Sequence, residues 1–399
     1  MENRGNVLYI QSGGPTAVIN SSARGVLDQC RKQQETGRIY AAEHGILGVI
    51  ENRLFDVTEE LEGEELLTET PSMIFGSCRY EIDENDPEKK DYRKILNTLK
   101  ERDIRYIFIN GGNGSVRAGL RLGNYLTSEN YDYRLIVIPK TVDNDISCID
   151  HAPGYPSAAR HVVVTVSELA RDMMTYDTEL ILFAEVMGRN TGFLAAASMA
   201  ANKIGMGPDL IYVPEILFSR EKFIDDVRQV LKKKGKCFVV AAEGVKTADG
   251  KFLFEDVSIN KGMDMKKNMG GITPCVCQML REAFSCKIRG IDLGLMQRCG
   301  AHTVSDIDRQ EAEELGRIAV KAAVGGESLQ MVTLRRKAGE PYEAVYGLEK
   351  LERVAREDNC LPLSLISESG NYIKETFLEY VLPLIGRLPQ YTKLNRPNV

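Results

Sequence analysis

Residues 137–146 read Val-Ile-Pro-Lys-Thr-Val-Asp-Asn-Asp-Ile. The apolar run 135–138 predicts a buried strand, and it stops at Pro139. A cation, a hydroxyl and two carboxylates follow at close spacing: Lys140, Thr141, Asp143 and Asp145. In open α/β folds, ligands bind beyond the carboxyl ends of the strands. This stretch therefore predicts an α/β sheet with a polar site at its rim.

The residue types in this cluster suit phosphoryl transfer. That reaction uses one carboxylate to take a hydroxyl proton, a cation to face the moving phosphoryl charge, and a second carboxylate for a metal. The alternative is an ordinary polar loop with a helix-capping Asp, because turns commonly collect Asp and Asn. On these ten residues alone, both interpretations stay open.

The first half of the chain repeats an order of strand, polar turn and helix. Apolar runs at 6–11, 106–109 and 135–138 predict buried strands, and helices are expected from 17 and over 116–126. The turns at 12–16 and 110–115 are rich in glycine. This alternation predicts a parallel, doubly wound sheet. A glycine turn at a helix N-terminus holds a phosphate through backbone N–H groups, although the first turn is neither a Walker loop nor the Rossmann fingerprint.

The same alternation continues in the second half, and a chain of 399 residues exceeds a typical single core. Strands are expected at 180–185, 210–213 and 237–241, and helices at 157–174, 195–201 and 306–323. The remainder after 323 reads as mostly helical. The expected domains are 1–154 plus about 297–350, then 155–296, and a C-terminal helical segment 351–399 that packs on both.

Composition excludes several classes of function. The net charge of −6 argues against general nucleic-acid affinity, which needs a basic face. Nine scattered cysteines without a zinc spacing fit reduced thiols in a cytoplasmic protein. The N-terminus lacks the apolar core of a signal peptide, and no apolar run approaches the ~20 residues that span a bilayer. No membrane partner is expected. The charged run 81–90 reads as a solvated surface.

Several motifs, in this order, resemble those of the phosphofructokinases: Ser-Gly-Gly-Pro-Thr at 12–16, Phe-Gly-Ser-Cys-Arg-Tyr at 75–80, Pro-Lys-Thr-Val-Asp-Asn-Asp at 139–145, Glu-Val-Met-Gly-Arg at 185–189, Ala-Glu-Gly at 242–244 and Gln-Arg at 297–298. The resemblance covers nearly the whole chain and is strongest to the bacterial pyrophosphate-dependent branch. It implies two Rossmann-like three-layer α/β domains, with the active site in the cleft between them. It also implies a homodimer or homotetramer.

The resemblance implies a role for each motif residue. Asp143 would deprotonate the C1 hydroxyl of fructose 6-phosphate, and Lys140 would stabilise charge on the transferring phosphoryl group. Thr141 and Asp145 complete the catalytic set, and Mg²⁺ would be held by Asn113 and Asp145. The donor side comprises Gly13, Gly14, Arg79, Gly112, Asn113, Gly114 and Ser115. The acceptor side comprises Thr141, Val142, Asp143, Met187, Gly188, Arg189, Glu243 and Arg298, with Arg289 supplied by a neighbouring subunit. Taken singly, each arginine also fits a surface salt bridge.

Two departures from the family pattern leave the donor open. The glycine turn has Asn113 and Gly114 where the family commonly has Asp at the first position, and an amide is a weaker Mg²⁺ ligand than a carboxylate. In the family, Asp at the second position goes with pyrophosphate and Gly goes with ATP, whereas Lys140 is typical of pyrophosphate-dependent members. Leu180 and Leu295 also replace polar residues that are common on the sugar side. Three functions follow: a pyrophosphate-dependent phosphofructokinase, the same reaction with ATP, and a degenerate sugar-phosphate-binding regulatory subunit.

Overall fold

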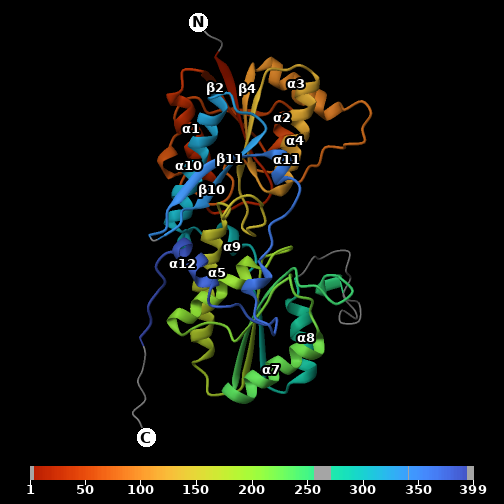
Figure 1. Ribbon diagram of the computed structural model, residues 1–399, viewed down its shortest axis with the longest axis vertical. Coiled ribbons are helices and arrows are strands. Elements are labelled where there is room, and N and C mark those ends of the chain that lie inside the picture. The colour runs from red at the N-terminus through yellow and green to blue at the C-terminus, as the bar shows by residue number, and fades with distance from the viewer. Residues whose placement is uncertain (1–3, 256–270, 340, 393–399) are drawn as a thin grey trace. The chain divides into compact units, whose positions relative to one another are not determined.

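The computed structural model describes residues 4–255, 271–339 and 341–392 (Figure 1). The chain divides into two compact units. The first comprises Met1–Ala158 and Arg298–Asn359, and the second comprises Ala159–Gln297 and Cys360–Val399. Each unit is built on its own, mainly parallel sheet, as the alternation of strands and helices predicts.

The first unit is built on a seven-stranded sheet in the order β11-β10-β5-β4-β1-β2-β3. The central strands run parallel, whereas the edge strands β3 and β11 run antiparallel to their neighbours. Its strands are β1 (Gly5–Gln11), β2 (Thr36–Ala42), β3 (Leu54–Asp56), β4 (Ile104–Gly111), β5 (Arg134–Pro139), β10 (Gln330–Arg336) and β11 (Ala344–Lys350). The parallel arrangement confirms the prediction for this half of the chain.

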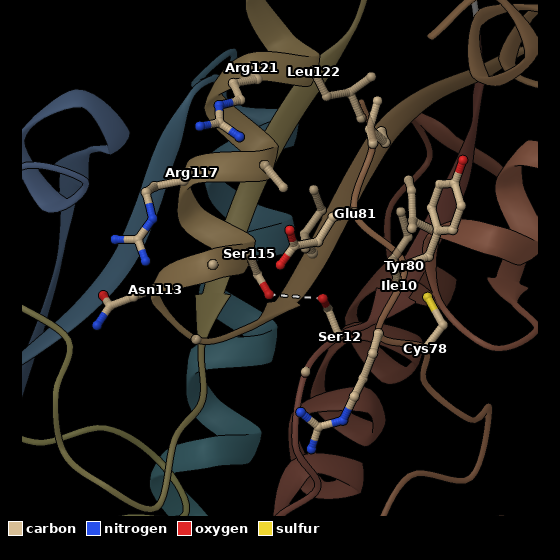
Figure 2. Close-up of a pocket in the computed structure, with 18 of the residues that line it drawn as sticks. Ile10, Ser12, Cys78, Tyr80, Glu81, Asn113, Ser115, Arg117, Arg121 and Leu122 are labelled. Carbon is tan, nitrogen blue, oxygen red and sulfur yellow. Dashed lines mark hydrogen bonds between the residues drawn. The ribbon is translucent and has the colours of Figure 1, made fainter. Parts of the chain in front are cut away.

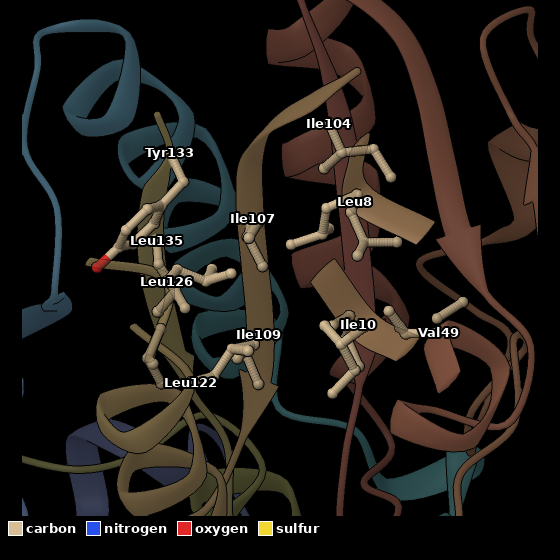
Figure 3. Packing of buried hydrophobic residues seen from close by; sticks show 14 of the residues in the cluster. Leu8, Ile10, Val49, Ile104, Ile107, Ile109, Leu122, Leu126, Tyr133 and Leu135 are labelled. Atoms are coloured by element: carbon tan, nitrogen blue, oxygen red, sulfur yellow. The ribbon is translucent and has the colours of Figure 1, made fainter. Parts of the chain in front are cut away.

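Helices cover both faces of this sheet (Figure 1). They are α1 (Ile19–Lys32), α2 (Ile46–Ile50), α3 (Lys90–Glu101), α4 (Asn113–Ser128), α10 (Asp306–Val324) and α11 (Leu351–Val354), with short 3₁₀ turns at Glu64–Leu66 and Ala301–Thr303. Successive residues of β1 point to opposite faces. Leu8 and Ile10 pack with α2, α3 and α4 (Figure 3), whereas Val7 and Tyr9 pack with α1 and α10.

Helices α1 and α10 meet backbone to backbone. A Cβ on Gly25 would lie 1.9 Å from the carbonyl oxygen of Glu313, and a Cβ on Gly316 would lie 2.3 Å from that of Ser22. Only glycine permits this approach, because such distances lie far inside van der Waals contact. The two helices therefore form one closely packed layer on their face of the sheet.

The second unit holds a four-stranded, fully parallel sheet in the order β7-β8-β6-β9. Its strands are β6 (Leu180–Val186), β7 (Leu210–Tyr212), β8 (Lys236–Ala242) and β9 (Lys287–Asp292). Its helices are α6 (Phe193–Ala197), α7 (Arg220–Lys234), α8 (Thr273–Ala283) and α12 (Phe377–Ile385), with 3₁₀ turns at Ser198–Ile204, Leu253–Glu255 and Leu363–Leu365. Helices α5 (Tyr155–Met173) and α9 (Met296–Cys299) each include a boundary between the units.

The expectation of a mostly helical remainder after residue 323 is wrong. Strands β10 and β11 pair antiparallel there instead, because the run 331–334 is buried and contains the β-branched Val332 and Thr333 rather than a helical spacing. In the described part of 351–392, α-helix is confined to α11 and α12. Residues 351–359 belong to the first unit and the following ones to the second. Within the described residues, no helix has both the length and the apolar character needed to cross a membrane.

Candidate active site

A pocket of about 600 Å³ opens at the carboxyl ends of β1, β4 and β5 in the first unit (Figure 2). It is lined by the turn after β1, the turn after β4 with the start of α4, the polar residues after β5, and the 78–84 loop. Ten of the residues that the sequence singles out line it: Gly13, Gly14, Arg79, Gly112, Asn113, Gly114, Ser115, Lys140, Thr141 and Asp145. Parallel strands bring these separate turns to a single edge.

Lys140 is a buried cation in the wall of this pocket. Its side chain is 4% exposed, and its Nζ donates a hydrogen bond to the Gly14 carbonyl oxygen at 2.6 Å. Burial lowers the pKa of Lys140 to about 8, against the opposing effect of the Asp145 and Asp143 carboxylates. Arg298 lies nearby, with its Nη1 3.6 Å from the position that a Cβ on Gly14 would occupy. The turn after β1 is therefore bordered by two cations, as an anionic ligand requires.

The turn after β4 leads directly into the N-terminus of α4. Asn113 is the first residue of this 16-residue helix, so its free backbone N–H groups and the helix dipole favour an anion there. The Ser115 Oγ donates a hydrogen bond to Ser12 Oγ at 2.9 Å and so joins the two glycine turns (Figure 2). No described atom lies within 4 Å of a Cβ built on Gly114.

Asp145 presents a ligand atom for a divalent metal. Its Oδ1 is buried, and among the described residues it has no hydrogen-bond partner. The Asn113 Nδ2 donates to the Asp145 backbone oxygen at 2.8 Å, which fixes the turn against this residue. The described residues contain no group of three His, Cys, Asp or Glu side chains that could hold a metal. One free carboxylate oxygen suits Mg²⁺, which is commonly bound through one or two carboxylates, substrate phosphates and water.

The 140–145 loop keeps its shape through hydrogen bonds within it and to the segment that follows. Thr141 Oγ1 accepts from the Asp143 N–H at 3.1 Å. Asn144 is buried and adopts a left-handed conformation with φ +62°, which Asn tolerates better than most residues. Its Oδ1 accepts from the Ala152 N–H at 2.9 Å. Asn144 has a structural role that the sequence did not assign, although its place between two Asp residues indicates a turn.

Most of the run 81–90 is exposed, as expected of a solvated surface, but part of it also borders the pocket. Glu81, Ile82 and Glu84 line the pocket, because the loop folds back over it. Glu84 Oε1 accepts from Tyr92 Oη at 3.0 Å and from Arg121 Nη1 at 3.2 Å. Arg121, like Arg117 one turn before it, projects from α4 and also lines the pocket (Figure 2). The four-residue spacing of Arg117 and Arg121 predicts that they share one face of a helix, but it gives no sign that this face meets the 78–84 loop.

The predicted acceptor residues of the second unit gather at the ends of β6 and β8. The Gly244 N–H donates to the Gly188 carbonyl oxygen at 3.1 Å, and a Cβ on Gly244 would lie 1.9 Å from the Arg189 carbonyl oxygen. The Met187 N–H donates to Gln297 Oε1 at 3.0 Å. These contacts place the loop of Met187, Gly188 and Arg189 beside the turn that holds Glu243, and the Arg189 guanidinium lies over the Phe252 ring at 5.5 Å.

Arg289 lies apart from that loop within the second unit. It sits on β9 opposite Leu182, and its Nη1 forms an ion pair with Asp172 Oδ2 at 3.1 Å. Leu180 begins β6, whereas Met187 follows its end, so the two are roughly 20 Å apart at the usual rise of a strand. Leu180 is buried in the core and Leu295 is 61% exposed, so the two leucines have different surroundings.

Comparison with known proteins gives consistent matches. Residues 6–323 match the phosphofructokinase family model. The chain is 34% identical to a pyrophosphate–fructose 6-phosphate 1-phosphotransferase of Halomonas elongata, over 99% of this chain and 97% of that protein. It is also 34% identical to a sulfofructose kinase of Alkalicoccus urumqiensis, over 92% and 91%. A crystal structure of a pyrophosphate-dependent phosphofructokinase from Nitrosospira multiformis has a TM-score of 0.86 at 34% identity, and covers 98% of this chain and 94% of that one.

Proposed function

This chain belongs to the phosphofructokinase family, and on that premise we propose that it transfers a phosphoryl group from pyrophosphate to the C1 hydroxyl of fructose 6-phosphate. The product is fructose 1,6-bisphosphate, and the reaction belongs to glycolysis. The observation that carries the choice of donor is the buried Lys140, whose Nζ lies against the glycine turn inside the pocket. Full-length similarity to pyrophosphate-dependent enzymes supports the same choice.

On the donor side, this chain supplies positive charge and N–H groups. The backbone of Gly13, Gly14 and 112–115 holds the phosphates, with Arg79 at the outer part of the pocket. Lys140 faces the phosphoryl group as it moves and stabilises the charge on its oxygens. Asp145 and Asn113 would hold Mg²⁺, which neutralises donor phosphate charge when bound.

On the acceptor side, Asp143 takes the proton of the C1 hydroxyl as that oxygen attacks the phosphoryl phosphorus, and inorganic phosphate leaves. Thr141 and Val142 contact the reacting end of the sugar. Met187, Gly188, Arg189 and Glu243 hold the sugar body, while Arg298 binds its 6-phosphate and Arg289 comes from a neighbouring subunit. The enzyme works as a homodimer or homotetramer in the cytoplasm, where nine cysteines scattered without a disulfide framework would stay reduced.

A coupled assay of fructose 6-phosphate phosphorylation tests this function, with pyrophosphate and ATP compared side by side and with and without Mg²⁺. We expect turnover on the order of 1–100 s⁻¹ with pyrophosphate and Mg²⁺. The Asp143→Ala variant should lose at least about 10²-fold in kcat, because the base is gone. Unchanged turnover in that variant would refute the mechanism, and no turnover with either donor would favour a regulatory subunit.

ATP is a second candidate donor, favoured by one specific observation. The space beside Gly114 is open, and the pocket continues past the glycine turns to apolar side chains of Ile10, Ile46 and Leu122. A volume of about 600 Å³ lies within the range of pockets that take drug-sized ligands. The Gly114→Asp variant should abolish ATP use and retain pyrophosphate use. ATP turnover that survives in this variant would show that charge and bulk at 114 do not select the donor.

The acceptor deserves the same comparison, because a sulfofructose kinase is as similar in identity as the pyrophosphate-dependent relatives. Sulfofructose carries a sulfonate with one negative charge in place of the phosphate. Leu180 is buried at the far end of β6 and Arg289 is paired to Asp172, so both lie away from the Met187–Arg189 loop and Arg298 is the cation left for the 6-substituent. Its charge is expected to favour the more highly charged phosphate over the sulfonate. Fructose 6-phosphate should give the higher kcat/KM. A higher value with sulfofructose would reassign the acceptor while leaving the donor chemistry intact.

A further inference from the structure

The 140–145 loop rests on a second stretch of the first unit, residues 150–157, which we call the anchor segment. The Thr141 N–H donates to the Pro153 carbonyl oxygen at 3.2 Å, and Thr141 pairs with Gly154 in an isolated parallel bridge. Asn144 Oδ1 accepts from the Ala152 N–H. Each end of the loop is therefore bonded to the anchor segment, so a shift of this segment would move the loop.

Two carboxylates from one face of α10 hold the anchor segment. Asp308 is fully buried and accepts three hydrogen bonds: from the Gly154 N–H at 2.9 Å, from the Ser157 N–H at 3.0 Å and from Ser157 Oγ at 2.5 Å. Glu311, one turn further along, binds His151 Nε2 through Oε2 at 2.7 Å. Helix α10 thus bonds to the anchor segment near its start, at His151, and near its end, at Gly154 and Ser157.

His151 lies at the centre of this contact and is 1% exposed. Its Nδ1 is 2.8 Å from Asp150 Oδ1, and its Nε2 faces Glu311. With both carboxylates ionised, both ring nitrogens must donate, which requires the imidazolium form. Burial alone would lower the pKa of His151, but the hydrogen bonds and charges of Asp150 and Glu311 raise it to about 9.

The remaining charged and titratable groups around His151 are part of the same cluster. Arg336 of β10 donates to Asp150 Oδ1 at 3.3 Å, and its guanidinium lies 4.8 Å from the Tyr342 ring centroid. Tyr342 Oη donates to Glu311 Oε1 at 2.5 Å. Asp308 also faces the imidazolium charge, and burial raises the pKa of Asp308 to about 6. Helix α10, strand β10 and the anchor segment therefore share one buried, largely ionic cluster.

We propose that His151, Asp308 and Glu311 form a positioning network, which holds the 140–145 loop in place for phosphoryl transfer through the anchor segment. This inference rests on the proposed function. None of the three residues lines the pocket, and they act through backbone and side-chain contacts with the anchor segment. A displacement of about 1 Å at a reacting group costs on the order of 10²-fold in rate, so the network controls kcat.

The test uses Glu311→Gln, His151→Gln and Asp308→Asn in the full-length protein. The matched control is Glu64→Gln, which removes another buried carboxylate of the first unit, one that pairs with Arg31 of α1 at 2.6 Å. At saturating substrates and at a temperature where circular dichroism shows folded protein, kcat should fall about 10- to 100-fold in the network variants. KM for both substrates should stay within about threefold, since the binding groups remain. The control should retain wild-type kcat.

An activity-independent readout separates this network from the proposed function. Hydrogen exchange in peptides that cover 137–146 should be faster in the network variants and unchanged in Glu64→Gln. Wild-type kcat and exchange in all three variants would overturn the proposal, as would an equal loss in the control. An inactive wild type would instead refute the proposed function, while exchange would still decide about the network.

Two variants that each remove a single hydrogen bond of the network allow the test if a larger substitution prevents folding. Ser157→Ala removes one hydroxyl bond to Asp308, and Tyr342→Phe removes the hydroxyl bond to Glu311. Each should reduce kcat by about two- to tenfold with unchanged KM, and the two losses together should differ from the sum of the single losses because the groups act as a unit. Unchanged kcat in both would count against the network.

Discussion

At the scale of single residues, the pH dependence of the enzyme is expected to reflect Lys140. The fold lowers its pKa to about 8, so the stabilising ammonium charge is present below that value and is lost above it. We predict that kcat/KM with pyrophosphate declines as pH rises through about 8. The Lys140→Met variant should lose at least about 10²-fold at pH 7 and lack this alkaline decline.

The measurement is kcat/KM for pyrophosphate between pH 6 and 10, because this ratio reports ionisations of the free enzyme. His151 is a second candidate for such a decline, since its raised pKa also falls near 9. The His151→Gln variant is therefore the control. A decline that persists in His151→Gln and disappears in Lys140→Met supports Lys140, and the reverse result contradicts the assignment.

At the scale of elements, the close packing of α1 on α10 is expected to resist any added atom. Gly→Ala normally stabilises an exposed helix by roughly 1 kcal/mol. In Gly25→Ala the new Cβ would overlap the Glu313 carbonyl oxygen, so we predict a net loss of about 1–3 kcal/mol in the free energy of unfolding. Gly119→Ala in α4 is the matched control, because its Cβ would meet only side-chain methyl groups at 3.2–3.5 Å.

Urea unfolding at constant slope measures both variants. A loss in Gly25→Ala no greater than in Gly119→Ala would show that the two helices separate at little cost. The distances that motivate this prediction join α1 near residue 25 to α10 near residue 313, far apart in sequence. The apolar spacing in either segment therefore predicts a helix, but it does not predict which other helix that helix will pack against.

Elements with a local sequence pattern could be predicted from the sequence, whereas elements that depend on tertiary contacts could not. Apolar runs directly before polar turns identify β1, β4, β5 and β6, because a parallel strand covered on both faces reads as a continuous apolar stretch. Strands β10 and β11 escape that pattern, since the buried apolar run of β10 is confined to residues 331–334 and β11 is a partly exposed edge strand. Their identity depends on pairing with β5 and with each other, which is a tertiary contact.

Site residues follow the same logic. The turns that supply Gly14, Asn113 and Lys140 were predicted because each follows a recognisable strand. Glu84 and Arg121 were not, because a charged loop and a helix face give no sign that they meet over a pocket. The contacts of His151 with Glu311 likewise join positions 160 residues apart. Local sequence patterns therefore predict the residues at the carboxyl ends of the strands. The residues that complete the pocket lining, and those that hold the 140–145 loop in place, depend on contacts between distant parts of the chain.

At the scale of the whole molecule, the first unit holds the predicted donor residues and part of the acceptor set, and the second unit holds the loops proposed to bind the sugar body. Gly14, Asn113 and Lys140 belong to the first unit, whereas Met187–Arg189 and Glu243 belong to the second. We predict that pyrophosphate with Mg²⁺ slows hydrogen exchange in peptides covering 12–16, 110–116 and 139–146. Fructose 6-phosphate should slow exchange in peptides covering 185–192 and 241–245, because bound ligand restrains these loops.

Sulfate at the same concentration is the control for non-specific anion effects. Protection of the second unit by pyrophosphate, without protection of the glycine turns, would reverse the assignment of donor and acceptor. The Asp143→Ala variant should show both patterns of protection, since it lacks the base but keeps the phosphate-binding turns.

The open space beside Gly114 has a consequence for the history of this enzyme. Two of the four glycine codons differ from an aspartate codon by a single nucleotide, and, among the described residues, no neighbouring side chain within 4 Å would have to move to admit the first side-chain carbon. A lineage could thus cross between a nucleotide and an inorganic donor in one mutational step, with no compensating change elsewhere. Donor preference would then follow which high-energy phosphate a cell keeps abundant, and it would change far faster than the architecture that surrounds it.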